Sequence, residues 1–207
     1  QAGRCYEVDM RLRPNGNAGL LVTSVTAFIR YQREQAWTWE HQALVRSRAV
    51  AGSPAVMEDY ARLRADVLAQ PRDPDALRTD VCTMRDKMRR ELARGDAQFH
   101  PKHMAGGMID IEFFSQWLVL AQAHAVGALT RFSDVLRILE VAAANDVLSE
   151  ASAQSLGDRY RALRARVHAH ALGSDDDVGL PAAPPELEAL FGAGEDAAEV
   201  SATEGRR

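Results

Sequence analysis

The sequence has 207 residues, is 46% hydrophobic and carries a formal net charge of −4, which is compatible with one sizeable core. It contains no apolar run of about 18 residues, so no membrane span is expected. The N-terminus lacks the apolar core of a signal peptide and starts with Gln1 instead of Met, which suggests a fragment. The only cysteines, Cys5 and Cys82, form no metal-ligand pair, which favours reduced thiols in a cytoplasmic protein.

The N-terminal segment 6–14 alternates between apolar and charged residues, a pattern that predicts a β-strand. Its apolar face holds Tyr6, Val8, Met10 and Leu12, and its charged face holds Glu7, Asp9, Arg11 and Arg13. The charged face is either simply solvated or binds a ligand. In the second case Asp9 supplies a hard oxygen ligand for Mg²⁺, and Arg11 and Arg13 flank a phosphate. A brief strand extension at 20–23 is also expected.

The rest of the chain reads as helices joined by short loops, which predicts a mainly α protein with an antiparallel helical bundle. Six or seven helices are expected, at about 24–35, 37–51, 53–69, 75–94, 110–124, 134–144 and 150–172. Ser24, Ser53, Ser133 and Ser149 are the expected N-caps. The helix at 110–124 is apolar nearly all round, so we place it in the middle of the bundle.

Charge is unevenly distributed along the chain. Residues 174–207 hold nine acidic and two basic side chains and are rich in Ala, Gly, Pro and Ser. This composition predicts a largely disordered tail over 173–207, with at most a short helix at Glu186–Phe191. The remainder is weakly basic, which suits a protein that handles phosphates but is too mild to indicate nucleic acid.

Two internal segments could carry chemistry. Trp37 and Trp39 are expected either to pack in the core or to fix a helix from which Glu40 or His41 faces a site. The second segment supplies candidate cofactor-binding residues, namely Lys102, Gly106, Gly107, Asp110 and Glu112. Its two glycines permit a tight turn or close approach to a ligand. On a helix Asp110 and Glu112 point about 200° apart, and Asp110 could instead be only an N-cap.

Four blocks of the sequence resemble the bacterial glutamine synthetase adenylyltransferase/adenylyl-removing enzymes. They are Val8–Pro14 with Asn15, Gly16 and Gly19, then Tyr31–Leu44, Gly106–Phe113 and Leu129–Asp134. The Ala-Trp-Thr-Trp-Glu-His-Gln segment and the Leu-Thr-Arg-Phe-Ser-Asp segment look like the C-terminal, adenylylating half of that family. The resemblance covers about residues 4–172 and leaves the acidic tail outside.

The resemblance implies that residues 1–23 are the last strand or strands of a nucleotidyltransferase α/β domain and that 24–172 form a helical bundle domain. It also implies transfer of AMP from ATP to a tyrosine of glutamine synthetase, with Mg²⁺ as cofactor and the PII signal protein as a second partner. Asp9 would be a catalytic metal ligand, with Arg11 and Arg13 on the nucleotide side. No nucleic-acid or membrane partner is implied.

The chain departs from the family pattern at one place. The Gly-Ser motif with two aspartates, which supplies the first two metal ligands in the family, does not precede Asp9. We therefore expect the isolated chain to be inactive. The alternatives are a non-catalytic helical module that binds glutamine synthetase or PII, and the adenylyl-removing, phosphorolytic half.

Overall fold

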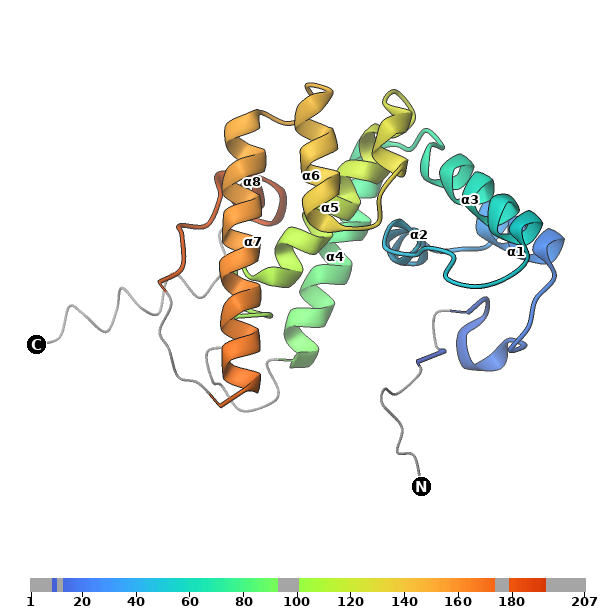
Figure 1. Ribbon diagram of the computed structural model, residues 1–207, viewed down its shortest axis with the longest axis horizontal. Helices are drawn as coiled ribbons and strands as arrows, with labels where there is room; N and C mark the ends of the chain where they lie inside the picture. The colour runs from blue at the N-terminus through green and yellow to red at the C-terminus, as the bar shows by residue number, and fades with distance from the viewer. Residues whose placement is uncertain (1–8, 11–12, 93–100, 174–178, 193–207) are drawn as a thin grey trace, which may run out of the picture.

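The computed structural model describes residues 9–10, 13–92, 101–173 and 179–192, and this part of the chain contains eight α-helices and no β-strand (Figure 1). Two short 3₁₀ helices lie at Gly16–Ala18 and Gly127–Thr130. The α-helices are α1 (Val25–Glu34), α2 (Thr38–Val45), α3 (Pro54–Leu68), α4 (Pro74–Leu92), α5 (Met108–Gln122), α6 (Val135–Ala144), α7 (Glu150–Ala171) and α8 (Pro185–Phe191). The prediction of a mainly α protein is confirmed.

Side-chain caps fix where several helices begin. The hydroxyls of Ser24, Ser53 and Ser149 accept hydrogen bonds from backbone amides three residues later, at 3.2, 3.4 and 3.0 Å. These are the predicted caps of α1, α3 and α7. At α6 the predicted cap is wrong by one residue, because the Asp134 carboxylate, not Ser133, accepts from the amide of Arg137.

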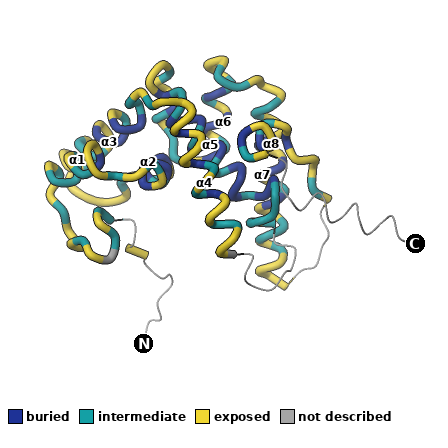
Figure 2. The backbone as a smooth tube through the Cα atoms, turned by 180° about the vertical axis from the view of Figure 1, so that it is seen from behind, coloured by how far each residue is buried: buried dark blue, intermediate teal, exposed yellow. Residues whose placement is uncertain are grey.

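Helix α5 lies at the centre of the molecule, as its apolar composition predicts. It packs against α2, α4, α6, α7 and α8. Buried stretches run along α5 in Figure 2, and Ile111, Val119 and Leu120 are fully enclosed. Helices α6 and α7 lie side by side and antiparallel, joined by a short turn, whereas α1 and α3 pack together at the other end of the molecule. The core is therefore organised around one helix.

The expected N-terminal strand is not supported. Residues 6–8 and 11–12 lie outside the described part, and Asp9 and Met10 are in no strand. The extension expected at 20–23 is wrong, because these residues form bends and irregular backbone, with the side chains of Leu20, Leu21 and Val22 exposed. A strand requires a neighbour to share its ladder of hydrogen bonds, and the described residues provide none.

Helix α2 ends at Val45, six residues earlier than predicted. The carbonyls at its end accept hydrogen bonds from a side chain of another helix. The Arg64 guanidinium, from α3, donates to the carbonyls of Leu44 and Val45. It also donates to the carbonyls of Thr130, the last residue of the second 3₁₀ helix, and of Phe132, just beyond that helix. Arg64 is buried, so one side chain joins three segments by satisfying four backbone groups.

Helix α8 forms where a short helix was expected, and it packs on the core. The side chains of Leu187 and Leu190 are buried, and α8 contacts α4 and α5. The thiol of Cys82 and the guanidinium of Arg78 donate to backbone carbonyls at its end. Residues 174–178 and 193–207 of the acidic segment lie outside the described residues. No described helix is long and apolar enough to span a membrane.

Arg64→Met should lower the free energy of unfolding by about 3 kcal/mol, because it leaves buried carbonyls without a donor. Urea denaturation followed by circular dichroism measures the change. Arg62→Met is the matched control, because Arg62 is exposed and, within the described part of the chain, its ion pair is with Asp59 on the same helix. Its effect should stay within about 0.5 kcal/mol. Equal losses from the two variants would contradict the role assigned to Arg64.

Candidate functional site

The loop that follows Asp9 is closed by Arg13. The Arg13 guanidinium donates to the carbonyls of Met10, at 2.7 Å, and Gly19, at 3.2 Å. At Gly19 a Cβ atom would lie 1.9 Å from the carbonyl oxygen of Pro14, so only glycine fits. Asp9 itself is exposed. The Mg²⁺ role of Asp9 and the phosphate role of Arg13 stay predictions, and Arg11 lies outside the described residues.

The segment around Trp37 does not place its tryptophans in the core. Trp37 is 70% exposed and Trp39 is also exposed, so the prediction that they pack in the core is wrong. The buried residue is Glu40, whose carboxylate accepts from the Tyr31 hydroxyl at 2.7 Å and from the Trp37 amide at 2.9 Å. Because N-terminal amides of a helix need acceptors, Glu40 serves to start α2.

His41 connects α2 to its neighbours. Its Nε2–H donates to the carbonyl of Gln32 at 2.9 Å, and its Nδ1 lies 3.4 Å from the Arg72 guanidinium. Burial lowers the pKa of His41, and the nearby charge of Arg72 acts in the same direction. A neutral ring fits both contacts, because one nitrogen donates and the other accepts. His41 is thus engaged in holding α2 against the chain around it.

Asp110 lies at the centre of a buried ion cluster. Its carboxylate accepts from Arg85 and from Arg89, the latter at 2.8 Å, and from the amide of Gly106 at 2.7 Å. Arg85 and Asp110 are 0% and 1% exposed. Burial lowers the pKa of Arg85, and the Asp110 carboxylate opposes that shift. Arg85 NH1 and Arg89 Nε have no hydrogen-bond partner among the described residues.

The two glycines before α5 allow the chain to pass close to other segments. Gly106 has a φ of +65°, and its carbonyl accepts from Arg159 Nε at 2.6 Å. A Cβ atom there would lie 2.9 Å from the Cβ of Ala183. At Gly107 a Cβ atom would lie 2.7 Å from the carbonyl oxygen of Met104. Backbone packing therefore accounts for both glycines, and the backbone carbonyl of Lys102 accepts from the α5 amide of Ile109.

Glu112 faces the opposite side of α5 from Asp110, in keeping with their spacing. Its carboxylate lies 2.6 Å from Arg46 NH1 and accepts from the Tyr160 hydroxyl at 3.0 Å. Burial, followed by the charge and hydrogen bond of Glu112, raises the pKa of Tyr160 to about 12. The two carboxylates therefore cannot share one ligand. Among the described residues no group of three or more His, Cys, Asp or Glu could hold a metal ion.

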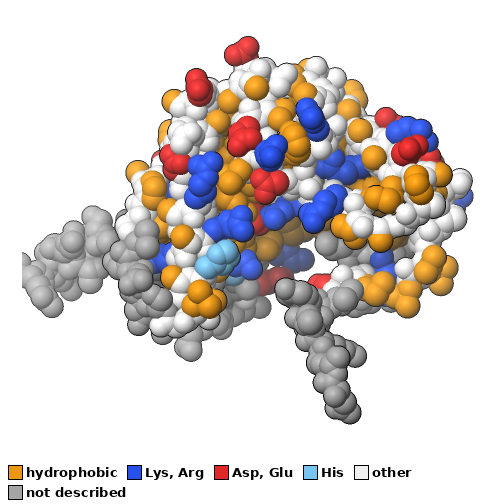
Figure 3. Space-filling model, viewed as in Figure 1, with side chains coloured by type: hydrophobic (Ala, Val, Ile, Leu, Met, Phe, Trp, Pro, Cys, Tyr) orange, Lys and Arg blue, Asp and Glu red, His pale blue; other side chains and the backbone are white. Residues whose placement is uncertain are grey.

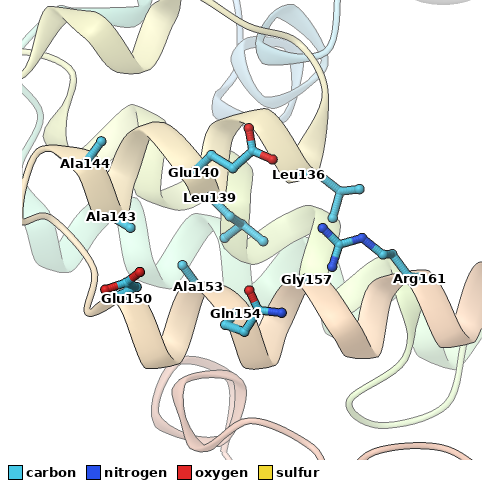
Figure 4. A pocket seen from close by; sticks show the side chains of 10 residues that line it. All are labelled: Leu136, Leu139, Glu140, Ala143, Ala144, Glu150, Ala153, Gln154, Gly157 and Arg161. Carbon is cyan, nitrogen blue, oxygen red and sulfur yellow. The ribbon is translucent and has the colours of Figure 1, made fainter.

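A groove of about 460 Å³ between α6 and α7 lies apart from these residues (Figure 4). Small side chains such as Ala143, Ala153 and Gly157 form much of its wall, with Glu140 and Arg161 at its edges. None of the residues predicted from sequence to bind a ligand lines it.

The arginines that pair with Asp110 and Glu112 were not predicted from the sequence. One signal for Arg85 was available, because it continues the stripe of Leu77 and Val81 at intervals of four residues, and all three are buried. An arginine in a buried stripe requires a buried acceptor. For Arg46 and Tyr160, which meet Glu112 from two other segments, the sequence offers no comparable local signal.

Residues 1–70 match the sequence model of the family described as glutamate-ammonia ligase adenylyltransferase. The chain is 50% identical over 177 residues to the bifunctional glutamine synthetase adenylyltransferase/adenylyl-removing enzyme of Hahella chejuensis, a match that covers 83% of this chain and 18% of that protein. It is 48% identical over 190 residues to the enzyme of the same name from Pseudomonas aeruginosa, covering 86% of this chain and 19% of that protein. The resemblance is confirmed, over about a fifth of the relatives' length.

Asp110→Asn should lower the free energy of unfolding by about 3 kcal/mol, because it removes the countercharge of the buried Arg85 guanidinium. Asp158→Asn is the control, because Asp158 is an exposed partner of Arg161 on one helix. Urea denaturation of both variants measures the difference. If Asp110 served only a ligand, its loss would change stability no more than the loss of Asp158.

Tyr160 should make stability depend on alkaline pH. Its folded pKa of about 12 exceeds the ordinary 10.0, so its contribution is complete below pH 10 and is lost as the pH rises toward 12. The tyrosinate absorbance of the parent chain minus that of Tyr160→Phe should therefore titrate near pH 12. A difference that titrates near pH 10 would show that the hydroxyl is neither buried nor bonded to Glu112.

Proposed function

Because this chain belongs, as a partial match, to the family of glutamine synthetase adenylyltransferase/adenylyl-removing enzymes, we propose that it is part of an enzyme that transfers AMP from ATP to a tyrosine of glutamine synthetase. Such a transfer regulates nitrogen assimilation. The observation that carries the proposal is the 50% identity over 177 residues. Residues 1–23 then belong to the nucleotidyltransferase domain and 24–172 to a helical domain.

Asp9 is the residue that we assign to the chemistry. Carboxylate oxygens suit Mg²⁺, and Asp9 is exposed, so the donor type and its accessibility fit the ion. When bound, Mg²⁺ neutralises phosphate charge during attack of the tyrosine oxygen on the α-phosphate of ATP, from which pyrophosphate leaves. One carboxylate does not complete such a site, and the described residues offer no cluster that could. The 207 residues alone are therefore proposed to be inactive.

The helical part is assigned a supporting role. Asp110, Glu112 and Glu40 are each occupied by hydrogen bonds from the chain itself. Groups so engaged position helices and are poorly available to substrate. This favours a domain that supports the site at Asp9 without contributing a second reactive centre.

Two alternative functions would give different experimental results from adenylyl transfer. Large apolar side chains are exposed near the N-terminus, with Leu20 at 78%, Val22 at 83% and Trp37 at 70%, which favours a surface that docks glutamine synthetase or PII. The adenylyl-removing half is the other alternative, because the relatives are bifunctional by name. Phosphate-dependent release of ADP from adenylylated glutamine synthetase would identify it.

Asp9→Asn in the longer enzyme, with the two further carboxylates present, should lower AMP transfer by about 100-fold or more, because a metal ligand is lost. Labelled ATP and glutamine synthetase provide the assay, and binding of glutamine synthetase should be unchanged. Asp59→Asn, on the exposed side of α3, is the control and should retain full activity. Full transfer by the Asp9 variant would refute the catalytic assignment.

The 207-residue chain alone should transfer no AMP from labelled ATP to glutamine synthetase, because it supplies too few carboxylates for the metal. The longer enzyme, assayed in parallel, shows that the target and the conditions are competent. Measurable transfer by the isolated chain would contradict the proposal that the missing carboxylates are essential.

A further inference from the structure

A second cavity, of about 320 Å³, opens where four helices meet. It lies between the C-cap of α2, the first residue of α5, the N-cap of α6 and the second half of α7. Its volume is at the lower end of the range of small-molecule pockets. The residues that line it are Arg46, Met108, Asp134, Tyr160, Arg164, Val167 and His168. None of the residues predicted from the sequence to bind a metal, nucleotide or cofactor lines this cavity.

Helix α7 presents one stripe of side chains to the cavity. Tyr160, Arg164, Val167 and His168 follow at intervals of four, three and one residues, so they share a helix face. The Arg164 guanidinium carbon lies 5.9 Å from the centre of the Tyr160 ring. Within the described ranges neither Arg164 nor His168 has an acidic partner, whereas Arg161, one turn earlier, pairs with Asp158 at 2.8 Å. Two basic side chains therefore face the cavity without forming an ion pair to any described residue.

Arg46 adds a third basic group from the opposite side. Glu112 holds it through a 2.6 Å contact to NH1, and the same carboxylate oxygen accepts from Tyr160. The guanidinium has five N–H groups, so this contact leaves donors for a ligand, and the side chain is 40% exposed. Glu112 therefore holds both Arg46 and Tyr160, which line the cavity from different helices.

Asp134, the acidic residue that lines the cavity, already accepts one hydrogen bond. Asp134 caps α6, and its Oδ1 accepts from the amide of Arg137 at 3.2 Å. The N-terminus of α6 also brings the positive end of a ten-residue helix to this side. Figure 3 shows Lys and Arg side chains gathered over this face of the molecule. A ligand would meet more donors than acceptors here.

We propose that this pocket binds a small oxyanion, namely the phosphate or carboxylate group of a metabolite, through Arg46, Arg164 and His168. Guanidiniums suit both groups because their planar N–H donors match paired oxygens. The partly engaged carboxylate of Asp134 can accept from a hydroxyl elsewhere on the same ligand. The inference does not depend on nucleotidyl transfer at Asp9, because the isolated chain contains every residue that it invokes.

The test is titration of the 207-residue chain, at constant ionic strength, with inorganic phosphate, AMP and succinate in separate experiments followed by NMR. Saturable shifts of amides in α7 around 164–168 are expected with at least one of the three. A phosphate-bearing ligand predicts binding of phosphate and AMP, and a carboxylate ligand predicts binding of succinate. Constant ionic strength removes general screening as an explanation.

Arg164→Gln and His168→Gln should each weaken that binding by about three- to tenfold, the loss expected for one exposed charged contact. Both side chains are exposed, so the fold should survive. Arg161→Gln and His170→Gln, on the same helix but outside the pocket, are the matched controls and should bind as the parent does. Absence of saturable binding in all three titrations, or equal binding by all four variants, would overturn the proposal.

Discussion

The arrangement of the helices depends on the hydrogen bonds and ion pairs of the buried Asp110 carboxylate. This carboxylate receives Arg85 and Arg89 from α4 and the amide of Gly106 from the turn before α5. The carbonyl of Gly106 in turn accepts from Arg159 of α7, which also donates to the carbonyl of Pro181 ahead of α8. A buried charge is costly unless an opposite charge or hydrogen-bond donors compensate it, so these segments assemble together around the carboxylate.

Two other arginines also join separate segments of the core through hydrogen bonds. Arg64 and Arg72 donate mainly to backbone carbonyls at the ends of helices, where acceptors lack a partner within the helix. Like Asp110, these arginines form their hydrogen bonds within the helical part and hold its helices together. In our account the exposed carboxylate of Asp9 supplies chemistry, and the oxyanion pocket lies on the far side of α5 from Asp110.

Local signals predicted much of the fold, and tertiary contacts account for what they missed. Ser53 followed by proline marks the start of α3 in the sequence itself, and the apolar composition of α5 predicts its central place. The early end of α2 could not be predicted, because Arg64 reaches it from a different helix. The candidate site was predicted only in part. The divergence of Asp110 from Glu112 follows from helix geometry, but their arginine partners are distant in sequence.

Diffraction from crystals of the longer enzyme, soaked with Mn²⁺ in place of Mg²⁺ and with a nucleotide, can show whether Asp9 holds the metal while the carboxylates of α5 are structural. The anomalous signal of Mn²⁺ should lie within ligand distance of the Asp9 carboxylate, with Asp110 still bound to Arg85. A metal bound by Asp110 or Glu112, or none beside Asp9, would contradict these assignments.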